Sequence, residues 1–375
     1  MSKTSVKDLL RAMNEIAPPF LAEEWDNVGL LVGRGDAPVS SALLTIDLTP
    51  AVVEEAVRQA CEAVISYHPP IFKAIKRIAN ATPVERVLMR LLERGIAVLS
   101  PHTALDAAPN GLNDWIAAGI GTGDVRALVP HGQLPPNEET KLVTFCPREA
   151  VDRLRDAMAA VGAGRIGGYE RCSFETSGTG TFFGGPQTQP KIGSRGVLER
   201  VDEVRLEMVC PRRALPLAVE TIRQFHPYEE PPIEIHALTP RPVRHTGAGR
   251  RLTLDQPATA DQICERLRAH FGVERLQIAL PDGAPQTHAR IGISAGAGGS
   301  HLDIAIDEGC TLFVTGECRH HDVLAALARG CGVLVAGHTN TERGYLPTLA
   351  RRFAASVEGV TFQIAVSDRD PFVSR

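Results

Sequence analysis

Residues Val333 to Tyr345 read VLVAGHTNTERGY, and this stretch decides how the chain is organised. Its apolar run, Val333 to Ala336, predicts a short buried strand that breaks at Gly337. His338 and Glu342 therefore follow the carboxyl end of a strand, where open α/β sheets carry their ligand-binding groups. An imidazole and a carboxylate four residues apart share one side of a helical turn, and both are common metal ligands. Alone, such a pair is more often an ordinary hydrogen-bonded surface contact than a metal site.

A second copy of this pattern lies far upstream. The apolar run Ile96 to Ser100 is followed by Pro101 and then by HTALD, residues His102 to Asp106. His-Thr-x-x-acid after a short strand thus occurs twice, as HTALD and as HTNTE. Similar strand endings are common among α/β proteins, but the repeated spacing is not, and it indicates an internal duplication.

The rhythm of strands and helices around each copy agrees with a duplication. The first unit comprises Ala42 to Ile46, Pro50 to Ala60, Ala63 to Ser66, Pro83 to Arg94 and Ile96 to Ser100. The second comprises Arg290 to Ser294, Gly299 to Glu308, Thr311 to Thr315, His320 to Arg329 and Gly332 to Ala336. Strands that alternate with helices predict βαβ units and a parallel sheet. We therefore predict an α/β fold whose main domain is a duplicated βαβαβ unit.

The middle of the chain has another character. Strand-Cys-Pro-Arg-helix occurs twice there, at Leu142 to Arg148 and at Val204 to Arg212. This pattern predicts an inserted ferredoxin-like α+β domain of the split βαβ type. The Gly-rich piece Ser177 to Gly196 would be a long hairpin or loop, and the basic cluster Arg241 to Arg251 a solvated linker. The predicted domains are 1–133 and 245–375, the two halves of the main domain, and 138–240, the insert.

Composition excludes several classes of protein. The 375 residues carry 40 basic and 44 acidic side chains, a net charge of −4, with no long block of one sign. This balance gives no nucleic-acid footprint and no basic membrane face. No signal-peptide pattern opens the chain, and no apolar run reaches the length of a membrane span, so we expect a cytoplasmic protein. The eight cysteines form no CxxC pair, which indicates reduced thiols rather than a disulfide framework or a zinc ribbon.

Six side chains follow predicted strand ends and are candidate metal ligands. We expect all of them at one sheet edge: His68, His102, Asp106, Glu317, His338 and Glu342. Two imidazoles with two carboxylates suit zinc, iron or manganese. A bridging carboxylate would hold two ions about 3.5 to 4 Å apart.

Two further motifs leave alternatives open. The Gly-rich stretch Gly292 to Ser300 opens a predicted helix but matches neither the P-loop nor GxGxxG, so we interpret it as a tight turn that lines the site. Trp25 and Asp26 precede a strand-like run, Gly29 to Val32. They are either parts of a turn into an edge strand or groups at a site or subunit contact.

Several motifs, in order, resemble one family. EEWDNVGLLVG, SYHPPIF, PHTALDAAPNGLND, GISAGAGG, TGE and GHTNTERG resemble the Nif-three-like dinuclear-metal family, often catalogued as GTP cyclohydrolase 1 type 2 homologs. The insert, with CSFETSGTGTF and HPYEE, resembles the CutA/PII-like insert of the longer bacterial members. The resemblance covers nearly the whole chain.

The resemblance implies a toroidal homohexamer built from trimers, with up to two divalent metal ions per subunit. Its ligands match His68, Asp106, His338 and Glu342, with His102 nearby. The family usually has paired histidines where this chain has Tyr67-His68. A phenol with a pKa of about 10 is a poor ligand unless the metal deprotonates it. Tyr67 therefore bears on whether the second metal binds.

Two functions fit these expectations. The first is a metal-dependent hydrolase that acts on a nucleotide or related substrate, resembling GTP cyclohydrolase. The second is a non-catalytic metal-binding regulatory or scaffold hexamer. The sequence offers no obvious general base apart from the ligands, which favours the second.

Overall fold

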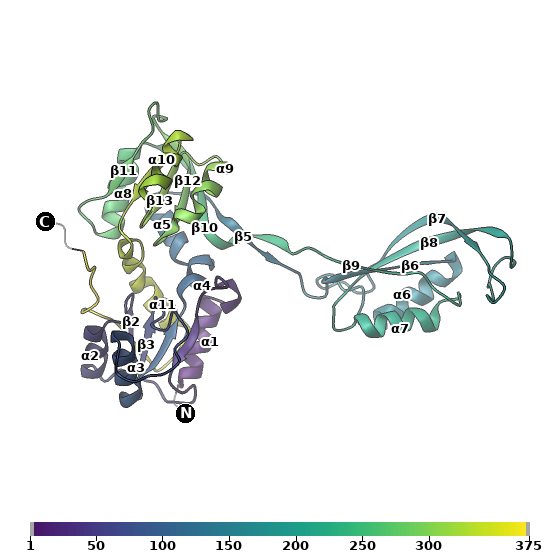
Figure 1. Cartoon of the computed structure of the whole chain (residues 1–375), viewed down its shortest axis with the longest axis horizontal. Coiled ribbons are helices and arrows are strands. Elements are labelled where there is room, and N and C mark those ends of the chain that lie inside the picture. The colour runs from purple at the N-terminus through teal and green to yellow at the C-terminus, as the bar shows by residue number, and fades with distance from the viewer. Residues whose placement is uncertain (1–3, 373–375) are drawn as a thin grey trace. The chain divides into compact units, whose positions relative to one another are not determined.

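The computed structural model describes residues 4–372 and shows a mixed α/β protein, as predicted (Figure 1). By its internal contacts the chain divides into two compact units. Unit 1 is Met1–His131 together with Val243–Arg375, and unit 2 is Gly132–Pro242. The bounds 1–133, 138–240 and 245–375 for separately folding domains stay a prediction.

The first sheet of unit 1 contains the first predicted βαβαβ unit. Its three parallel strands alternate with two helices: β2 (Ser41–Thr45), α2 (Pro50–Arg58), β3 (Ala63–Ser66), α3 (Pro83–Arg94) and β4 (Ala97–Ser100). Thr49 and Thr82 accept hydrogen bonds from backbone N–H groups in the first turns of α2 and α3, and a proline follows each cap. Two further strands complete the sheet in the order β1-β4-β3-β2-β15: β1 (Gly29–Val32) and β15 (Thr361–Ile364).

The second sheet of unit 1 repeats this arrangement. Its parallel core consists of β12 (His288–Ser294), α9 (Leu302–Asp307), β13 (Leu312–Thr315), α10 (His320–Ala328) and β14 (Gly332–Val335). The sheet has the order β11-β14-β13-β12-β10-β5, with β11 (Gln277–Ala279), β10 (Arg241–Ala258) and β5 (Gly123–Gln133). Both predicted βαβαβ units are therefore present, each in a sheet of its own.

The two halves of unit 1 exchange their last helix and strand. Helix α5 (Leu112–Ile120) belongs to the first half, yet its apolar side packs in the core of the second half, and β5 joins the second sheet. Helix α11 (Leu346–Ser356) of the second half packs in the core of the first, and β15 pairs in parallel with β2. The exchange interlocks the halves and fixes the strand ends that carry the candidate ligands.

A buried arginine also joins the halves. Arg250 on β10 is fully buried, and its Nε lies 2.5 Å from Asp114 Oδ1. The guanidinium also donates to carbonyl oxygens of Gly247 at 2.7 Å and Ala108 at 2.9 Å. The prediction of a solvated linker over Arg241 to Arg251 is therefore wrong. This cluster is the start of a strand, and one of its charges is satisfied in the interior.

Unit 2 has one four-stranded sheet and two helices. Along the chain these are β6 (Thr140–Cys146), α6 (Val151–Ala160), β7 (Phe174–Phe183), β8 (Leu198–Cys210), α7 (Leu215–Phe225) and β9 (Ile233–Ala237). The sheet order is β7-β8-β6-β9, and all pairs are antiparallel. Leu154 on α6 and Ile222 on α7 lie in its core. Residues 177–183 belong to β7 and pair antiparallel with β8, so the stretch from Ser177 to Gly196 is part of a long hairpin, the first of the two forms expected for it.

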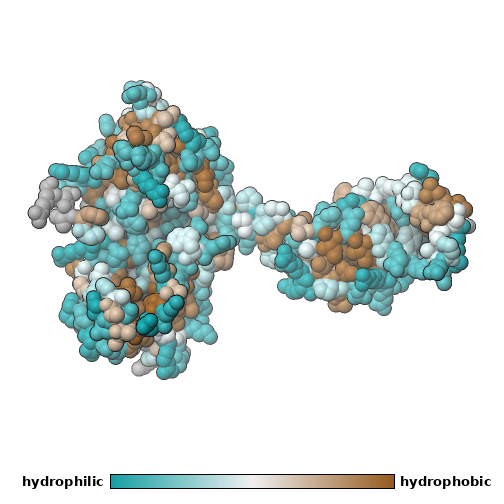
Figure 2. Space-filling view, viewed as in Figure 1, coloured by the Kyte–Doolittle hydropathy of each residue, from teal (hydrophilic) through white to brown (hydrophobic). Residues whose placement is uncertain are grey.

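Hydrophilic and hydrophobic residues are interspersed over the visible face of both units (Figure 2). Among residues 4–372 we find no helix with the length and apolar character that crossing a membrane requires. Each of the eight cysteines is a free thiol, as predicted.

Candidate metal site

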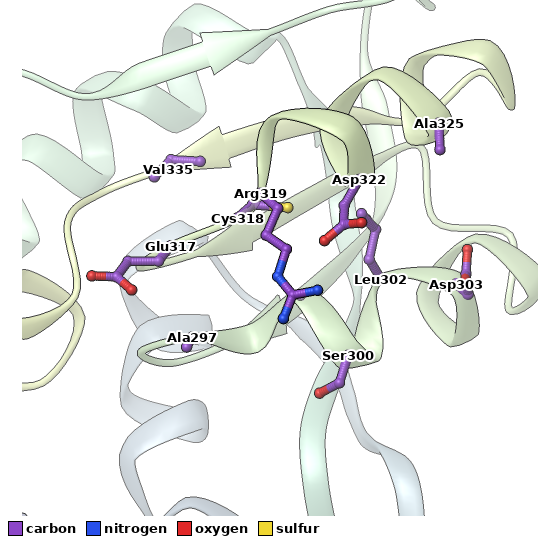
Figure 3. A pocket seen from close by; sticks show the side chains of 11 residues that line it. Ala297, Ser300, Leu302, Asp303, Glu317, Cys318, Arg319, Asp322, Ala325 and Val335 are labelled. Carbon is purple, nitrogen blue, oxygen red and sulfur yellow. The ribbon is translucent and has the colours of Figure 1, made fainter.

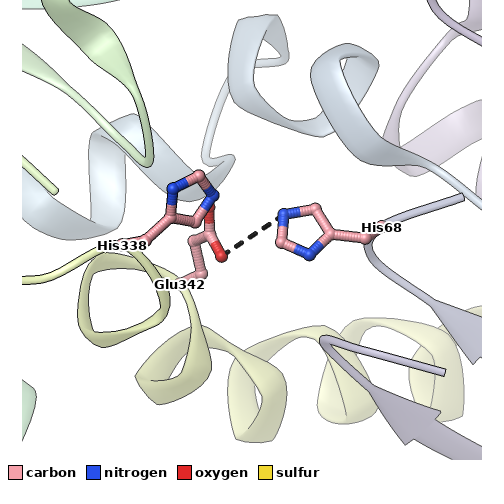
Figure 4. Close-up of side chains that lie close together, drawn as sticks. All are labelled: His68, His338 and Glu342. Atoms are coloured by element: carbon pink, nitrogen blue, oxygen red, sulfur yellow. Dashed lines mark ion pairs between the residues drawn. The ribbon is translucent and has the colours of Figure 1, made fainter. Parts of the chain in front are cut away.

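Three predicted ligands meet in unit 1. His68 follows β3, and His338 and Glu342 follow β14, so both sheets contribute (Figure 4). The ligand atoms of the three side chains lie within 4.8 Å of one another. Glu342 Oε2 lies 3.6 Å from His68 Nε2, and Oε1 lies 3.4 Å from His338 Nε2. The expectation of a single sheet edge is wrong, because the site lies where the ends of two sheets face each other.

The local backbone explains how His338 and Glu342 come to share a side. Gly337 has φ of +90°, which turns the chain sharply after β14. Two 3₁₀ turns follow, η4 (Thr339–Thr341) and η5 (Arg343–Tyr345). Thr341 Oγ1 donates to the His338 carbonyl at 2.7 Å and accepts from the Gly296 N–H at 3.0 Å. The hydroxyl therefore fastens this turn to the Gly-rich loop.

The Gly-rich loop lines the site, as predicted, and its glycines permit close approach. Gly296 has φ of +56°, and a Cβ at this position would lie 2.8 Å from Glu342 Oε1. Gly316, which follows β13 outside this loop, permits a similar approach, since a Cβ there would lie 2.9 Å from His338 Cα. A larger residue at either position would displace a ligand.

Glu342 is the central group of the site. Its side chain is 2% exposed, and among the described residues its Oε2 has no hydrogen-bond partner. A buried carboxylate is costly without a compensating partner. Two imidazole nitrogens and this oxygen form a donor set that suits zinc, iron or manganese, so the residues fit a divalent cation.

Carboxylates orient both imidazoles. His68 Nδ1 lies 2.8 Å from Asp47 Oδ1, and His338 Nδ1 lies 3.4 Å from Glu317 Oε2. Engaging Nδ1 turns Nε2 toward the shared site, the usual arrangement of metal-bound histidines. Glu317, a predicted ligand candidate, thus lies on the outer side of His338. Burial disfavours the charged form of His68, but Asp47 and Glu342 outweigh it and raise the pKa to about 10.

Asp106 lines the same pocket but lies outside the group of three. Its Oδ1 accepts a hydrogen bond of 2.6 Å from the Tyr67 hydroxyl. Burial raises the pKa of Asp106 to about 6, although this hydrogen bond opposes the shift. Burial, with the negative charge of Asp106, also raises the pKa of Tyr67 well above its ordinary value. The phenol is therefore a hydrogen-bond donor that occupies one oxygen of a predicted ligand.

His102 also lines the pocket but lies outside the group of three ligands. Its Nδ1 lies 2.7 Å from Oδ1 of Asp26, a buried side chain. The other oxygen of Asp26 accepts hydrogen bonds from the backbone N–H and the hydroxyl of Thr103. His102 has φ of +28°, an uncommon conformation for a residue with a side chain. Asp26 thus lies behind a residue of the pocket wall, in the turn that leads into the edge strand β1, as the first alternative predicted. A role for Trp25 or Asp26 at a site or subunit contact stays a prediction.

The site lies in a pocket of about 740 Å³ that both halves of unit 1 line. A neighbouring pocket of about 760 Å³ lies around Cys318 and Arg319 (Figure 3). Ala297 and Ser300 line both pockets, and Glu317 lies on the wall of the second. The Glu317 carboxylate, which faces His338 Nδ1, therefore borders a different cavity from the one that the three ligands line.

Sequence reasoning missed Asp47 as a partner of His68. Asp47 comes two residues after β2, so the rule that polar groups follow parallel strands also applies to it. The fold and the site together define a two-sheet α/β protein with a candidate His/Glu metal site between duplicated halves.

Comparison with known proteins identifies the family. The family described as Duf34/NIF3 (NGG1p interacting factor 3) matches residues 4–371, and the chain belongs to it. The rat protein named NIF3-like protein 1 is 35% identical over 373 residues, which covers 98% of this chain and 92% of the rat protein. A Bacillus subtilis protein named GTP cyclohydrolase 1 type 2 homolog is 28% identical, covering 98% and 97%.

Solved structures agree with this assignment. The Staphylococcus aureus protein SA1388 covers all of both chains with 25% identity and a TM-score of 0.74. A Bacillus cereus protein related to NIF3 also covers all of both chains, with 25% identity and a TM-score of 0.67. The resemblance of the sequence motifs to the Nif-three-like family is therefore confirmed.

Proposed function

We propose that this protein binds divalent metal through His68, His338 and Glu342. The observation that carries the proposal is the buried Oε2 of Glu342, which has no partner among the described residues and lies beside two imidazoles. A cation would satisfy this oxygen and replace the proton that His68 otherwise holds. Asp106 supplies a ligand for a second ion, which gives up to two ions per subunit.

We further propose that the metal serves hydrolysis of a nucleotide or related substrate. A bound divalent cation acts as a Lewis acid and lowers the pKa of water. Asp47 and Glu317 hold the two imidazoles in orientation, and Glu342 contributes the negative charge that retains the cation. The pocket of about 740 Å³ has the size of a site for a small molecule. Bacterial relatives are named GTP cyclohydrolase 1 type 2 homologs, which supports a nucleotide as the substrate.

The second candidate is a non-catalytic metal-binding regulatory or scaffold protein. It is favoured by the hydrogen bond from Tyr67 to Asp106, because this bond occupies an oxygen that a second ion would need. In both cases we propose a homohexamer, a toroid of trimers, located in the cytoplasm.

Elemental analysis of the purified full chain, with a GTP turnover assay, tests these proposals. We expect at least one zinc, iron or manganese per chain in the wild type and none in Glu342→Gln. Glu93→Gln, an exposed position on α3, is the matched control and should keep its metal. Less than one metal per chain in both the wild type and Tyr67→His would refute the site. Metal without turnover of GTP and other nucleotides would favour the regulatory function.

A further inference from the structure

Two large aromatic side chains lie open on the wall of the candidate site. Trp25 is 58% exposed and Phe72 is 52% exposed, and both line the pocket that holds the three ligands. Their ring centroids are 5.6 Å apart with planes tilted by 52°. We call this pair the aromatic shelf. Large aromatic rings gain much from burial, so a paired exposed set beside a polar site calls for an explanation.

The shelf is continuous with the ligands through a series of rings. The His102 ring lies 6.0 Å from Trp25 and 6.5 Å from Phe72, measured between centroids. The same ring lies 5.4 Å from His68, which itself lies 5.5 Å from His338. A molecule held on the shelf therefore lies one imidazole away from the candidate metal ligands.

The backbone holds both parts of the shelf in place. Asn27, two residues after Trp25, donates from Nδ2 to the Ile71 carbonyl at 2.6 Å, beside Phe72. The Glu23 N–H donates to Thr103 Oγ1 at 3.1 Å, and the Asp26 N–H to the Glu23 carbonyl at 2.9 Å. The two segments are thus tied to each other and to α4 (His102–Ala107). A shelf that is already ordered loses little conformational entropy when it binds a ligand.

The polar groups around the shelf are largely paired with each other. The Thr103 hydroxyl donates to Asp26 and accepts from Glu23, while the His102 Nδ1 is engaged by Asp26. What the shelf offers a ligand is mainly the faces and edges of its rings. Such a surface favours a planar ring with π electrons, since aromatic stacking tolerates many different bases.

We propose that Trp25 and Phe72 form a stacking site for a planar heteroaromatic ring of purine size. The inference rests on the proposed function, because the rest of the same molecule would extend past His102 toward His68, His338 and Glu342. The ring is held by the shelf and the reacting group by the metal site. Recognition of this kind distinguishes aromatic from non-aromatic ligands more sharply than one base from another.

Calorimetry on the full chain tests the shelf with two matched probes. GMP carries a purine ring, and ribose 5-phosphate is the same sugar phosphate without the ring. We expect GMP to bind and ribose 5-phosphate not to bind at the same concentrations. Phe72→Ala should weaken GMP binding roughly fivefold to hundredfold, the range for loss of one base-stacking side chain. Phe20→Ala is the matched control, since Phe20 is 60% exposed and does not line the pocket.

Fluorescence gives a second, local measurement. The chain has two tryptophans, and Trp115 packs away from the shelf against His270 with centroids 4.2 Å apart. In Trp115→Phe the remaining emission comes from Trp25, and GMP should quench it whereas ribose 5-phosphate should not. In Trp25→Phe, which keeps Trp115, GMP should leave the emission unchanged.

Three results would overturn the shelf. One is equal binding of the two probes, and another is equal GMP affinity in Phe72→Ala and Phe20→Ala. The third is a change of oligomeric size in Phe72→Ala with no loss of GMP binding, which would assign the shelf to a contact between copies. Metal content measured on the same samples keeps the two proposals apart. Metal without GMP binding refutes the shelf alone, and GMP binding by a preparation that never holds metal refutes the metal site alone.

Discussion

The segments His102–Asp106 and His338–Glu342 of unit 1 share the spacing His-x-x-x-acid, but only the second contributes to the group of three candidate ligands. His338 and Glu342 direct nitrogen and oxygen atoms at a common point, where they meet His68. His102 and Asp106 line the same pocket but lie outside this group of three, and Asp106 Oδ1 accepts a hydrogen bond from Tyr67. A repeated motif therefore places residues at equivalent strand ends without giving them equivalent tasks.

The difference arises from the residue that comes directly after the neighbouring strand. In the first half β3 is followed by Tyr67, whose phenol reaches Asp106. In the second half β13 is followed by Gly316, which has no side chain to offer, and Glu342 Oε2 is left without a partner among the described residues. The backbones differ too, since His102 opens helix α4 whereas His338 precedes two 3₁₀ turns. The duplication supplies the position, and adjacent side chains decide which position is a ligand.

The two segments can be compared only if the two halves of unit 1 keep fixed positions relative to each other. Removing Arg250, which joins the halves, is expected to have the largest effect. Arg250→Ala should lower the free energy of unfolding by about 3–5 kcal/mol, because Asp114 would lose its buried partner and several carbonyl groups their donor. Urea unfolding followed by circular dichroism measures the change.

The neighbouring residue on the same strand provides the control. Arg251 pairs with Glu308, a half-exposed side chain, at 2.7 Å. Arg251→Ala should cost no more than about 1 kcal/mol, as is typical of such pairs. Equal losses in the two variants would show that Arg250 does not join the halves.

The next largest effect separates the two histidines of the repeated motif. His338→Gln should weaken metal binding more than about a hundredfold, because losing a ligand costs more than losing the residue that hydrogen-bonds to a ligand. His102→Gln should leave metal affinity unchanged, because His102 lies outside the group of three ligands. Competition with a chromophoric chelator measures both. If the two variants lose metal equally, the difference between the motifs disappears.

Much of the fold followed from local patterns in the sequence. The predicted helix Pro83 to Arg94 is helix α3, and the predicted strands Ala63 to Ser66 and Ile96 to Ser100 are the buried parallel strands β3 and β4. These elements are predictable because a short apolar run between turn residues has few alternatives. The positions of His68, His338 and Glu342 followed from the same rule.

The remaining features depend on contacts between residues far apart in the chain. The exchange of α5 and β5 against α11 and β15 leaves no local mark, since either half could bury the same apolar faces. Arg250 reads as one charge in a basic cluster, and only its contact with Asp114 explains its burial. Asp26 reaches His102 across 76 residues, a pairing that no periodicity reveals.

A smaller loss of metal affinity is expected when Asp47, the partner of His68, is changed. Asp47→Asn keeps the size of the side chain but removes the charge that faces His68 Nδ1 at 2.8 Å. Metal affinity should fall about tenfold to hundredfold, the usual effect of losing the partner of a metal-bound histidine. The chelator competition measures it, with Asp36→Asn, an exposed position, as the control. An unchanged affinity would mean that Asp47 does not orient His68.

The smallest loss of metal affinity is expected when Glu317, the partner of His338, is changed. Glu317 is exposed and lies 3.4 Å from His338 Nδ1, longer than a strong hydrogen bond, so solvent screens much of its charge. Glu317→Gln should therefore lower metal affinity less than about tenfold, below the loss in Asp47→Asn. The same competition assay ranks the two variants. A larger loss in Glu317→Gln would mean that metal binding draws this carboxylate onto His338, and the two halves would then support their histidines equally.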